Sequence, residues 1–392
     1  MTRVYIVGAK RTAIGKFGGA LSTVKASDLG GYAIKGALLQ GPADLKVDQV
    51  LMGSVLQAGQ GQNPARQASQ FAGLGDEVPA VTINDVCGSG LTSINMAASL
   101  IQSGQAQVVV AGGMENMSQA PFALDRARFG YRMGDGQLTD LLLRDALEDA
   151  NGGFHMGITA ENIAERYAVS RVDMDTFALE SHQRAVAAQK AGRFTDEIIP
   201  VPVVDRRGEK TLVSQDEGPR PDTSLAKLAG LKPAFKPEGR VTAGNASGIN
   251  DAAAAVLLVS EEVVQTHGLT PLAEWQAASL VGLDPKFMGL GPYYAVEDLL
   301  KKPNTPDLDQ IDVLELNEAF AAQAVATNRL LALDPARVNP NGGAIALGHP
   351  VGASGARILV TLLYEMQDLQ AEFGLAALCI GGGMGAATLL KR

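Results

Sequence analysis

The sequence predicts an α/β fold, because two patterns alternate along the chain. Short apolar runs typical of buried strands are separated by longer segments in which apolar residues recur with the period of an α-helix. Elements in this order form sheets whose faces are covered by helices. A glycine-rich motif that occurs once in each half of the chain further indicates two related halves.

The individual elements follow from these runs in chain order. Strands are expected at residues 4–7, 50–55, 79–83, 108–111, 254–260, 313–316 and 376–380. Helices are expected at residues 26–39, 65–72, 91–102, 158–166, 173–191, 319–333 and 355–369. Ser27-Asp28 and Asp173 are polar residues of the kind that favour the start of a helix.

The repeated motif is a glycine-flanked turn, then a helix, then a strand that ends in Gly-Gly-Met. In the first copy, Gly88-Ser89-Gly90 begins the helix and Gly112-Gly113-Met114 ends the strand. In the second copy, Ala353-Ser354-Gly355 and Gly382-Gly383-Met384 take these places. Coincidence between glycine-rich turns is the alternative, and the shared order weighs against it. We therefore expect an internal duplication.

Residues 121–247 differ in character from both halves and are expected to form an inserted loop domain. This segment is longer and more polar than a simple connection, with much proline and glycine. The N-terminal half is then made of residues 1–120 plus 248–270, and the C-terminal half of residues 271–392. A basic segment between Arg220 and Arg240 favours phosphate binding within the insert, with a solvated basic surface as the alternative.

Composition limits the classes of partner. The chain has 392 residues, 46% of them apolar and 19% charged, as in a folded protein of two or three packed units. A net charge of -9 argues against nucleic acid and membrane surfaces as partners. No apolar stretch has the length of a membrane helix, and the N-terminus enters a strand pattern at once, so we expect no signal peptide. With only two cysteines, a disulfide scaffold is excluded and a cytoplasmic location is expected.

Cys87 is the first candidate catalytic residue. It lies in a glycine-flanked turn between the strand at 79–83 and the helix at 91–102. Unpaired N–H groups and the helix dipole favour an anion at such a position, so we expect a thiol that ionises more easily than free cysteine. A buried structural cysteine is the alternative.

His349 and Cys379 are the next candidates. His349 stands between glycine and proline just before the helix at 355–369, in a rigid turn that suits a base or a hydrogen-bond donor. Cys379 ends a strand and runs into three glycines, whose N–H groups suit an oxyanion. The alternatives are a structural histidine and a buried strand residue followed by a tight turn.

Asn317 is a fourth candidate, because it stands with Glu318 where a strand gives way to a helix. Helix capping is the alternative for this asparagine. No metal site is expected, since the cysteines and histidines lack the spacing of local zinc ligands. A lipase-type nucleophile is also excluded, because no serine stands in Gly-x-Ser-x-Gly.

Two thiols, one histidine and a glycine-built oxyanion site suit reversible acyl transfer with carbon–carbon bond formation. One thiolate stores an acyl group by exchange with a thioester of similar energy. A second base removes the α-proton of another thioester, and preorganised donors stabilise the enolate oxygen.

Four of these segments together resemble the signature motifs of the thiolase family. They are residues 84–90, 317–320, 348–350 and 379–385, in the order and at the spacing of that family over the whole chain. Residues 61–67, 155–157, 245–251 and 287–289 resemble its short-chain, acetyl-CoA acetyltransferase branch in particular. The resemblance implies a five-layered αβαβα fold of two duplicated α/β/α halves, and a homo-oligomer that is a dimer or a dimer of dimers. The stretch from Ser118 to Thr139 lies where the family places its tetramerisation loop.

The resemblance also implies a role for each candidate. Cys87 accepts the acetyl group, and His349 activates Cys87. His349 also binds the thioester oxygen of the incoming acetyl-CoA together with a water held by Asn317. Cys379 abstracts or returns the α-proton. The backbone N–H groups of Cys87 and Gly381 form a second oxyanion hole, which holds the acyl-enzyme carbonyl.

For substrate binding, the resemblance implies two groups of residues. The pantetheine and nucleotide parts of CoA are lined by His155, Arg220, Phe235, Ala246 and Ser247, and the acyl pocket is shaped by Met156, Met288 and Phe320. The partners implied are acetyl-CoA, acetoacetyl-CoA and free CoA. CoA thioesters are substrates here, and no cofactor is expected.

The leading hypothesis is a reversible Claisen condensation of two acetyl-CoA to acetoacetyl-CoA and CoA. It runs by a ping-pong mechanism through acetyl-Cys87. A degradative 3-ketoacyl-CoA thiolase with longer substrates is the main alternative, because the sequence does not reveal the depth of the acyl pocket. A noncatalytic lipid-binding or acyl-CoA-binding relative of the same fold is a remote alternative, since both thiols and the histidine are present. A decarboxylating ketoacyl synthase is weaker still, because that class uses a second histidine where Cys379 stands.

Overall fold

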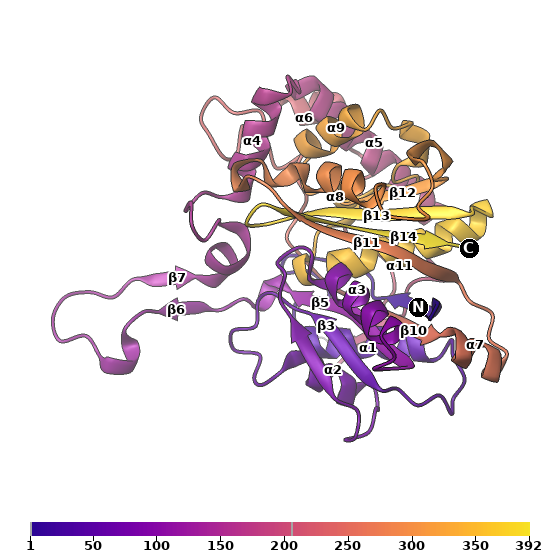
Figure 1. Ribbon diagram of the computed structural model, residues 1–392. Helices are drawn as coiled ribbons and strands as arrows, with labels where there is room; N and C mark the ends of the chain where they lie inside the picture. The colour runs from indigo at the N-terminus through magenta and orange to yellow at the C-terminus, as the bar shows by residue number, and fades with distance from the viewer. Residues whose placement is uncertain (1, 205–206) are drawn as a thin grey trace.

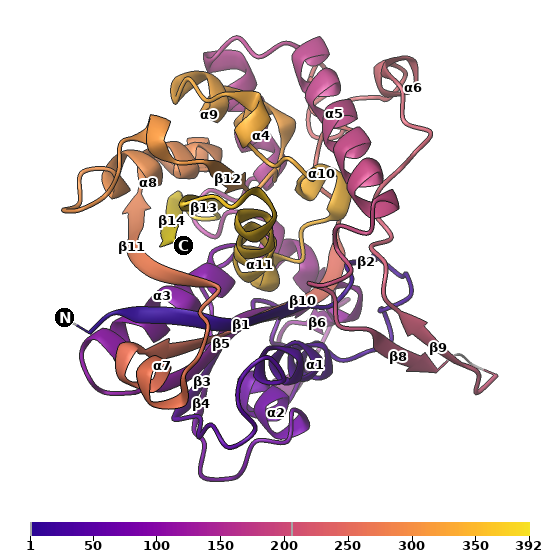
Figure 2. The same ribbon diagram turned by 90° about the vertical axis from the view of Figure 1, so that its right-hand side faces the viewer.

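The computed structural model describes residues 2–204 and 207–392. Five alternating layers of helices and strands form the body (Figures 1 and 2). The outer helices are α1 (Ala26–Leu38) and α2 (Pro64–Phe71) on one side and α8 (Gly291–Leu299) on the other. The central layer consists of α3 (Ser89–Gln102) and α11 (Val351–Leu369), and α11 contacts strands of both halves. The expected αβαβα arrangement is confirmed.

Each half contributes one set of paired strands. The N-terminal set has the order β4 (Ala80–Ile83), β3 (Gln49–Gly53), β5 (Val108–Asn116), β10 (Asn250–Ser260) and β1 (Val4–Arg11). The C-terminal set has the order β12 (Val313–Leu316), β13 (Phe373–Ile380), β14 (Met384–Lys391) and β11 (Ala273–Gly282). A short pairing of Val4–Ile6 with Ala273–Trp275 joins the two sets into one continuous sheet.

The same topology in both halves confirms the duplication. In each set, parallel strands at one end are followed by antiparallel strands toward the junction. A parallel bridge between Leu314 and Val338 stands in the C-terminal half where β4 pairs with β3 in the N-terminal half. The fifth strand of the second half is thus reduced to one residue.

The repeated Gly-Gly-Met motif, however, is used differently in the two halves. Gly112 and Gly113 lie inside β5, where a Cβ on Gly113 would come within 2.0 Å of the carbonyl oxygen of Gly352. Gly382 and Gly383 instead have φ values of +84° and +83° in the turn between β13 and β14. The first pair permits α11 to approach the sheet, whereas the second permits a tight reversal.

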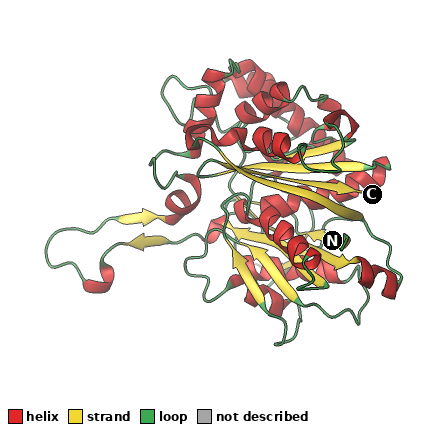
Figure 3. Cartoon of the chain, viewed as in Figure 1, coloured by secondary structure: helices red, strands yellow, loops and turns green. Residues whose placement is uncertain are grey.

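The segment between β5 and β10 contains several separate elements. Its hairpin β6 (Phe122–Leu124) and β7 (Leu138–Asp140) forms an arm that extends far from the body (Figures 1 and 3). Its helices are α4 (Met156–Arg166), α5 (Arg171–Lys190) and α6 (Leu225–Ala229). Helix α5 packs on α6 and on α10 (Ala344–Leu347), and both α4 and α5 pack on α9 (Ala321–Leu330) of the C-terminal half. A second hairpin is formed by β8 (Val201–Val204) and β9 (Lys210–Val213).

The remaining elements are short. They are β2 (Gly15–Lys16), α7 (Glu261–His267), the π-helical segment η3 (Leu143–Leu147) and the 3-10 segments η1 (Met117–Gln119), η2 (Ala127–Phe129), η4 (Pro285–Leu290), which is kinked at Phe287, η5 (Leu308–Gln310) and η6 (Pro335–Arg337). Throughout residues 2–204 and 207–392, none of the helices has the length and hydropathy needed to cross a bilayer.

The predicted helix starts need two corrections. Helix α1 is preceded by Lys25, which makes no side-chain capping bond, so Ser27-Asp28 lie inside the first turn. Helix α5 begins at Arg171, and Ser170 and Asp173 cap it reciprocally. Asp173 is therefore the third residue of the helix, where its carboxylate accepts the backbone N–H of Ser170.

Candidate active site

The first turns of α3 and α11 meet at the centre of the molecule. A Cβ on Gly90 would lie 2.8 Å from the backbone nitrogen of Ala356, and one on Gly355 would lie 2.5 Å from that of Leu91. Only glycine allows this approach. Because Cys87 and His349 each stand two residues before one of these helices, the packing brings them to the same junction.

The turn that carries Cys87 is held by local hydrogen bonds. The hydroxyl of Ser89 accepts from the backbone nitrogen of Asp85 at 2.8 Å and donates to the carbonyl of Val86 at 2.6 Å. Val86 has a φ of 46°, which is strained for a β-branched residue. Backbone strain of this kind persists where the surroundings over-determine it, as they do in many active sites.

Burial changes the expected acidity of Cys87. The side chain is buried, and desolvation raises the pKa of its thiol to about 11. The backbone N–H groups of Gly381 and Cys87 itself favour the thiolate but offset only part of this effect. The expectation of a thiol more acidic than free cysteine is therefore wrong for the unliganded protein, and ionisation needs a base beside the sulfur.

His349 is neutral near pH 7. Burial, and then the positive charge of Arg357 in α11, lower the pKa of its imidazole to about 4. Its Nε2 atom is buried and has no hydrogen-bond partner among the described residues. A neutral imidazole with a free nitrogen is suited to accept a proton.

Ser354 fixes the tautomer of His349. Its hydroxyl lies 2.5 Å from Nδ1 of the imidazole and donates to the carbonyl of Pro350 at 2.9 Å. Since a hydroxyl has one proton to donate, Ser354 accepts from Nδ1–H. The lone pair is then on Nε2, so Ser354 orients the base. From the sequence, this serine was expected only at the start of a helix.

Two further groups hold the turn of His349 in place. The side-chain oxygen of Asn250 accepts the backbone N–H of His349 at 2.9 Å. The carboxylate of Glu115 accepts from Gly352 at 3.0 Å and from Val55 at 2.9 Å, so it ties α11 to the end of β3. Neither residue was expected to support His349, although Asn250 lies within the motif at residues 245–251, because nothing local marks a contact between such distant segments.

Asn317 lies beside His349 at the end of β12. It is fully buried, its side-chain nitrogen is 3.4 Å from Nδ1 of His349, and its Oδ1 has no partner among the described residues. Helix capping is excluded as its role, because α9 begins four residues later with Phe320 as its N-cap. Two buried polar atoms of these neighbouring side chains are thus left without partners among the described residues, Oδ1 of Asn317 and Nε2 of His349. Each is suited to hold a water.

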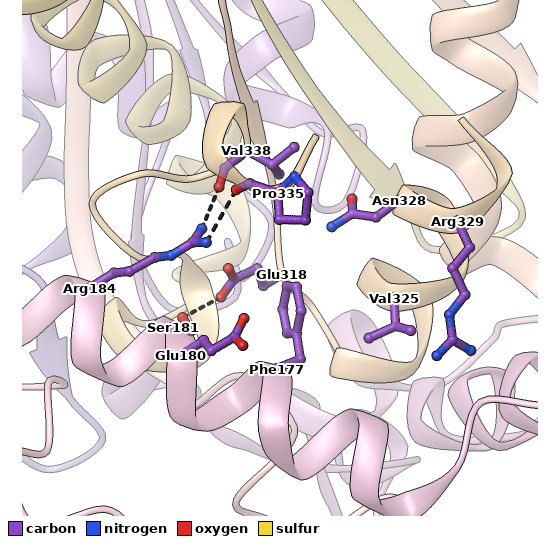
Figure 4. A pocket seen from close by; sticks show the side chains of 10 residues that line it. All are labelled: Phe177, Glu180, Ser181, Arg184, Glu318, Val325, Asn328, Arg329, Pro335 and Val338. Carbon is purple, nitrogen blue, oxygen red and sulfur yellow. Dashed lines mark hydrogen bonds between the residues drawn. The ribbon is translucent and has the colours of Figure 1, made fainter. Parts of the chain in front are cut away.

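Glu318 anchors the segment that carries Asn317. It is buried and accepts hydrogen bonds from the Ser181 hydroxyl at 2.6 Å, from Asn339 at 2.9 Å and from the Ile345 backbone at 3.2 Å. Figure 4 shows it beside a cavity of about 160 Å³ at α5, where Arg184 donates to neighbouring carbonyls. Since Glu318 and Arg184 are both bonded within the protein, we assign them a structural role.

Cys379 and Gly381 approach Cys87 from the end of β13. A Cβ on Gly381 would lie 3.1 Å from Val86, and one on Gly88 would lie 2.4 Å from Ile380. The Cys379 side chain is buried, which raises the pKa of its thiol, and the proximity of Cys87 raises it further. The two thiols therefore lie close enough to interact electrostatically, and the Gly381 N–H group donates to the Cys87 sulfur.

The predicted acyl-pocket residues also come together. Met156, Met288 and Phe320 are buried in the same apolar cluster as Cys379, although they come from α4, η4 and the start of α9. The sulfur of Met156 would lie 3.7 Å from a Cβ on Gly381. An apolar wall around the second thiol favours a small acyl group over a charged one.

The predicted CoA residues fall into two places. His155 stacks on Phe235 with ring centroids 4.7 Å apart, Phe235 contacts Phe320, and Ala246 bridges to Phe320. Ser247 donates its backbone N–H to the carbonyl of Ala319 at 3.0 Å, so it joins this group.

Arg220 instead lies exposed beside His182, outside the apolar cluster.

The basic segment is less positive than its sequence suggests. Lys227 pairs with Asp222, and Lys236 with Glu165. The Arg240 guanidinium donates to two backbone carbonyls around the end of α4. Arg220 and Lys232 make no ion pair with the described residues, so they are the cations left for a phosphate.

Known proteins resemble the chain over its whole length. The family model for the thiolase N-terminal domain matches residues 4–262, and that for the thiolase C-terminal domain matches residues 269–392. An acetyl-CoA acetyltransferase of Cupriavidus necator is 52% identical, and a probable acetyl-CoA acyltransferase of Staphylococcus aureus is 51% identical, each over 100% of both chains. The crystal structure of the Bacillus anthracis acetyl-CoA acetyltransferase superimposes with a TM-score of 0.97 at 44% identity, covering 100% of this chain and 99% of that one.

Proposed function

The chain belongs to the thiolase family, and from this membership we propose that it is an acetyl-CoA acetyltransferase. It condenses two acetyl-CoA to acetoacetyl-CoA and CoA, and also catalyses the reverse reaction. The observation that carries the proposal is the convergence of three groups on the junction of α3 and α11. The Cys87 and Cys379 thiols interact electrostatically there, and His349 precedes α11 at the same junction. A single thiol is sufficient to store an acyl group, whereas removal of the α-proton requires a second base.

In the first half-reaction, the sulfur of Cys87 attacks the thioester carbonyl of acetyl-CoA. Nε2 of neutral His349 takes the thiol proton and passes it to the departing CoA sulfur, so that free CoA leaves. The backbone N–H groups of Cys87 and Gly381 hold the carbonyl oxygen of the acetyl group. Both N–H groups favour negative charge at this position, which supports the assignment.

In the second half-reaction, Nε2 of His349 takes the thiol proton of Cys379, and the resulting thiolate removes a methyl proton from a second acetyl-CoA. The carbanion attacks the acetyl carbonyl, the carbon–carbon bond forms, and the bond to Cys87 breaks. Cys379 then gives the α-proton to the Cys87 sulfur, and His349 returns its proton to Cys379. We propose that the enolate oxygen accepts hydrogen bonds from Nε2–H of the protonated His349 and from a water held by Oδ1 of Asn317. Both atoms lack a partner among the described residues, which supports this assignment.

For substrate binding, we propose that the insert of residues 121–247 supplies most contacts to CoA. His155, Phe235, Ala246 and Ser247 would line the pantetheine arm beside the apolar cluster. Exposed Arg220 would contact the nucleotide end. Met156, Met288 and Phe320 would limit the acyl group. No cofactor enters the reaction, and two reduced thiols suit the cytoplasm.

The test is thiolysis measured over a series of 3-ketoacyl-CoA chain lengths. We expect kcat/KM to be highest for acetoacetyl-CoA and at least about tenfold lower for 3-ketohexanoyl-CoA, since each extra methylene meets a filled apolar wall. Mass spectrometry of the peptide that contains Cys87 should show an acetyl group. Equal or higher turnover of longer substrates would support the degradative alternative instead.

We also propose a homotetramer built as a dimer of dimers. The arm of residues 122–140 exposes Phe129 by 89% and Met133 by 96%, which is costly unless a partner covers them. The edge strand β4 leaves backbone groups unpaired and exposes Val81 by 43%. The arm suits the contact between dimers, and the edge strand suits the contact within a dimer.

Light scattering on an arm variant tests this assembly. Replacing both Phe129 and Met133 by serine is expected to halve the molar mass, from tetramer to dimer. Leu39→Ser changes a side chain that is 72% exposed at the end of α1, away from the arm, and should leave the mass unchanged. An arm variant that keeps the mass of the unmodified protein would contradict the proposed role of the arm.

A further inference from the structure

Gln323 in α9 has a buried amide whose orientation is set by its neighbours. One end lies 3.2 Å from the carbonyl oxygen of Asn317, and the other lies 2.8 Å from the backbone N–H of Ala324. The first end must therefore be the nitrogen and the second the oxygen, because each then meets a group of opposite kind. This orientation satisfies both ends of the amide.

The nitrogen of this amide also faces the second thiol. The end of the amide that bonds Asn317 lies 3.7 Å from Sγ of Cys379, within hydrogen-bond range for sulfur. A side-chain amide nitrogen has two hydrogens, so one can bond Asn317 while the other points at the sulfur. The backbone at Gly289 also packs closely against Gln323, since a Cβ on Gly289 would lie 2.7 Å from Cβ of Gln323.

Apart from Gln323, the surroundings of Cys379 provide little stabilisation for a thiolate. The sulfur is buried among apolar side chains of α4, η4 and α9. Its own backbone N–H favours the thiolate, while burial and the neighbouring Cys87 oppose it. A thiol that must act as a base here needs another donor.

We infer that Gln323 is a positioning residue that donates a hydrogen bond from Nε2 to the Cys379 thiolate. It thereby stabilises the base that removes the α-proton, and its bond to the Asn317 carbonyl couples that base to the oxyanion site. The inference rests on the proposed function, because it assumes that Cys379 acts as a thiolate. Gln323→Met removes the donor at nearly constant volume and should leave Cys87 intact.

The experiment measures alkylation of Cys379 directly, without substrate. In a Cys87→Ser background Cys379 is the only cysteine of the chain, so iodoacetamide labels a single site. Adding Gln323→Met is expected to move the midpoint of the labelling rate to a pH about one unit higher. At any pH below that midpoint, labelling should be about ten times slower, because the thiolate has lost a hydrogen bond. Gly289→Ala should give a smaller shift in the same direction, because it displaces Gln323 without changing it.

Thr327→Val is the matched control. This residue is buried one turn further along α9, and its hydroxyl has no partner among the described residues. It should leave the labelling profile unchanged. Identical profiles for Gln323→Met, Gly289→Ala and the parent would overturn the inference. If the unmodified protein did not transfer acetyl groups, the proposed function would be overturned. The labelling experiment would still test Gln323, because it uses no substrate.

Discussion

Cys87→Ser is expected to abolish the acetyl-enzyme and to lower kcat by at least about 10⁴-fold, as loss of a nucleophile does in other enzymes. A serine hydroxyl is far less acidic than a thiol. In addition, an oxygen ester is not close in energy to the thioester of CoA, so exchange would no longer be reversible. The measurement is the mass of the intact protein after mixing with acetyl-CoA, compared with the rate of acetoacetyl-CoA cleavage in the presence of CoA.

Controls for this variant use residues of the same pocket. Cys379→Ser keeps Cys87 and should still gain one acetyl group from acetyl-CoA, which shows that a substitution in the pocket does not itself prevent labelling. Thermal unfolding of Cys87→Ser should remain close to that of the parent, since the exchange is nearly isosteric. Acetylation that persists in Cys87→Ser would place the nucleophile elsewhere.

Much of this site could be predicted, because its parts are local in sequence. Cys87, Asn317, His349 and Gly381 each lie in a glycine-rich turn or at a strand end, where functional groups are often found. Their meeting follows from the packing of α3 on α11. The repeated glycine motif indicated two equivalent helices, but not that their first turns touch.

The supporting groups could not be predicted, since they depend on contacts between distant segments. Glu115 reaches Gly352 from a strand in the other half of the chain, and Asn250 reaches His349. The prediction that the Cys87 thiol has a low pKa is wrong for a related reason. A helix start favours the thiolate locally, but the depth of burial, which outweighs it, is a property of the assembled fold.

The missed fold elements show where periodicity is a weak guide. Residues 313–316 form the expected strand, because a run of four buried residues is too short for a helix and suits a sheet covered on both faces. Strand β11 (Ala273–Gly282) was missed although its buried and partly exposed residues alternate, because alanine and serine give that alternation little contrast. Strand β14 was missed because it follows β13 after only three glycines.

Cys379→Ala is expected to separate the two half-reactions. Acetyl-CoA should still acetylate Cys87, because attack and departure of CoA use only Cys87 and His349. Condensation should fall by at least about 10³-fold, since a positioned proton-transfer group contributes a factor of roughly 10² to 10⁴.

Acetoacetyl-CoA should become a poor acetyl donor to Cys87 in this variant, because its cleavage releases a carbanion that Cys379 must protonate. The two donors thus test one variant by different routes, and mass spectrometry of the Cys87 peptide follows both. If both donors acetylated Cys87 equally slowly, Cys379 would be needed to organise the pocket rather than to move the α-proton.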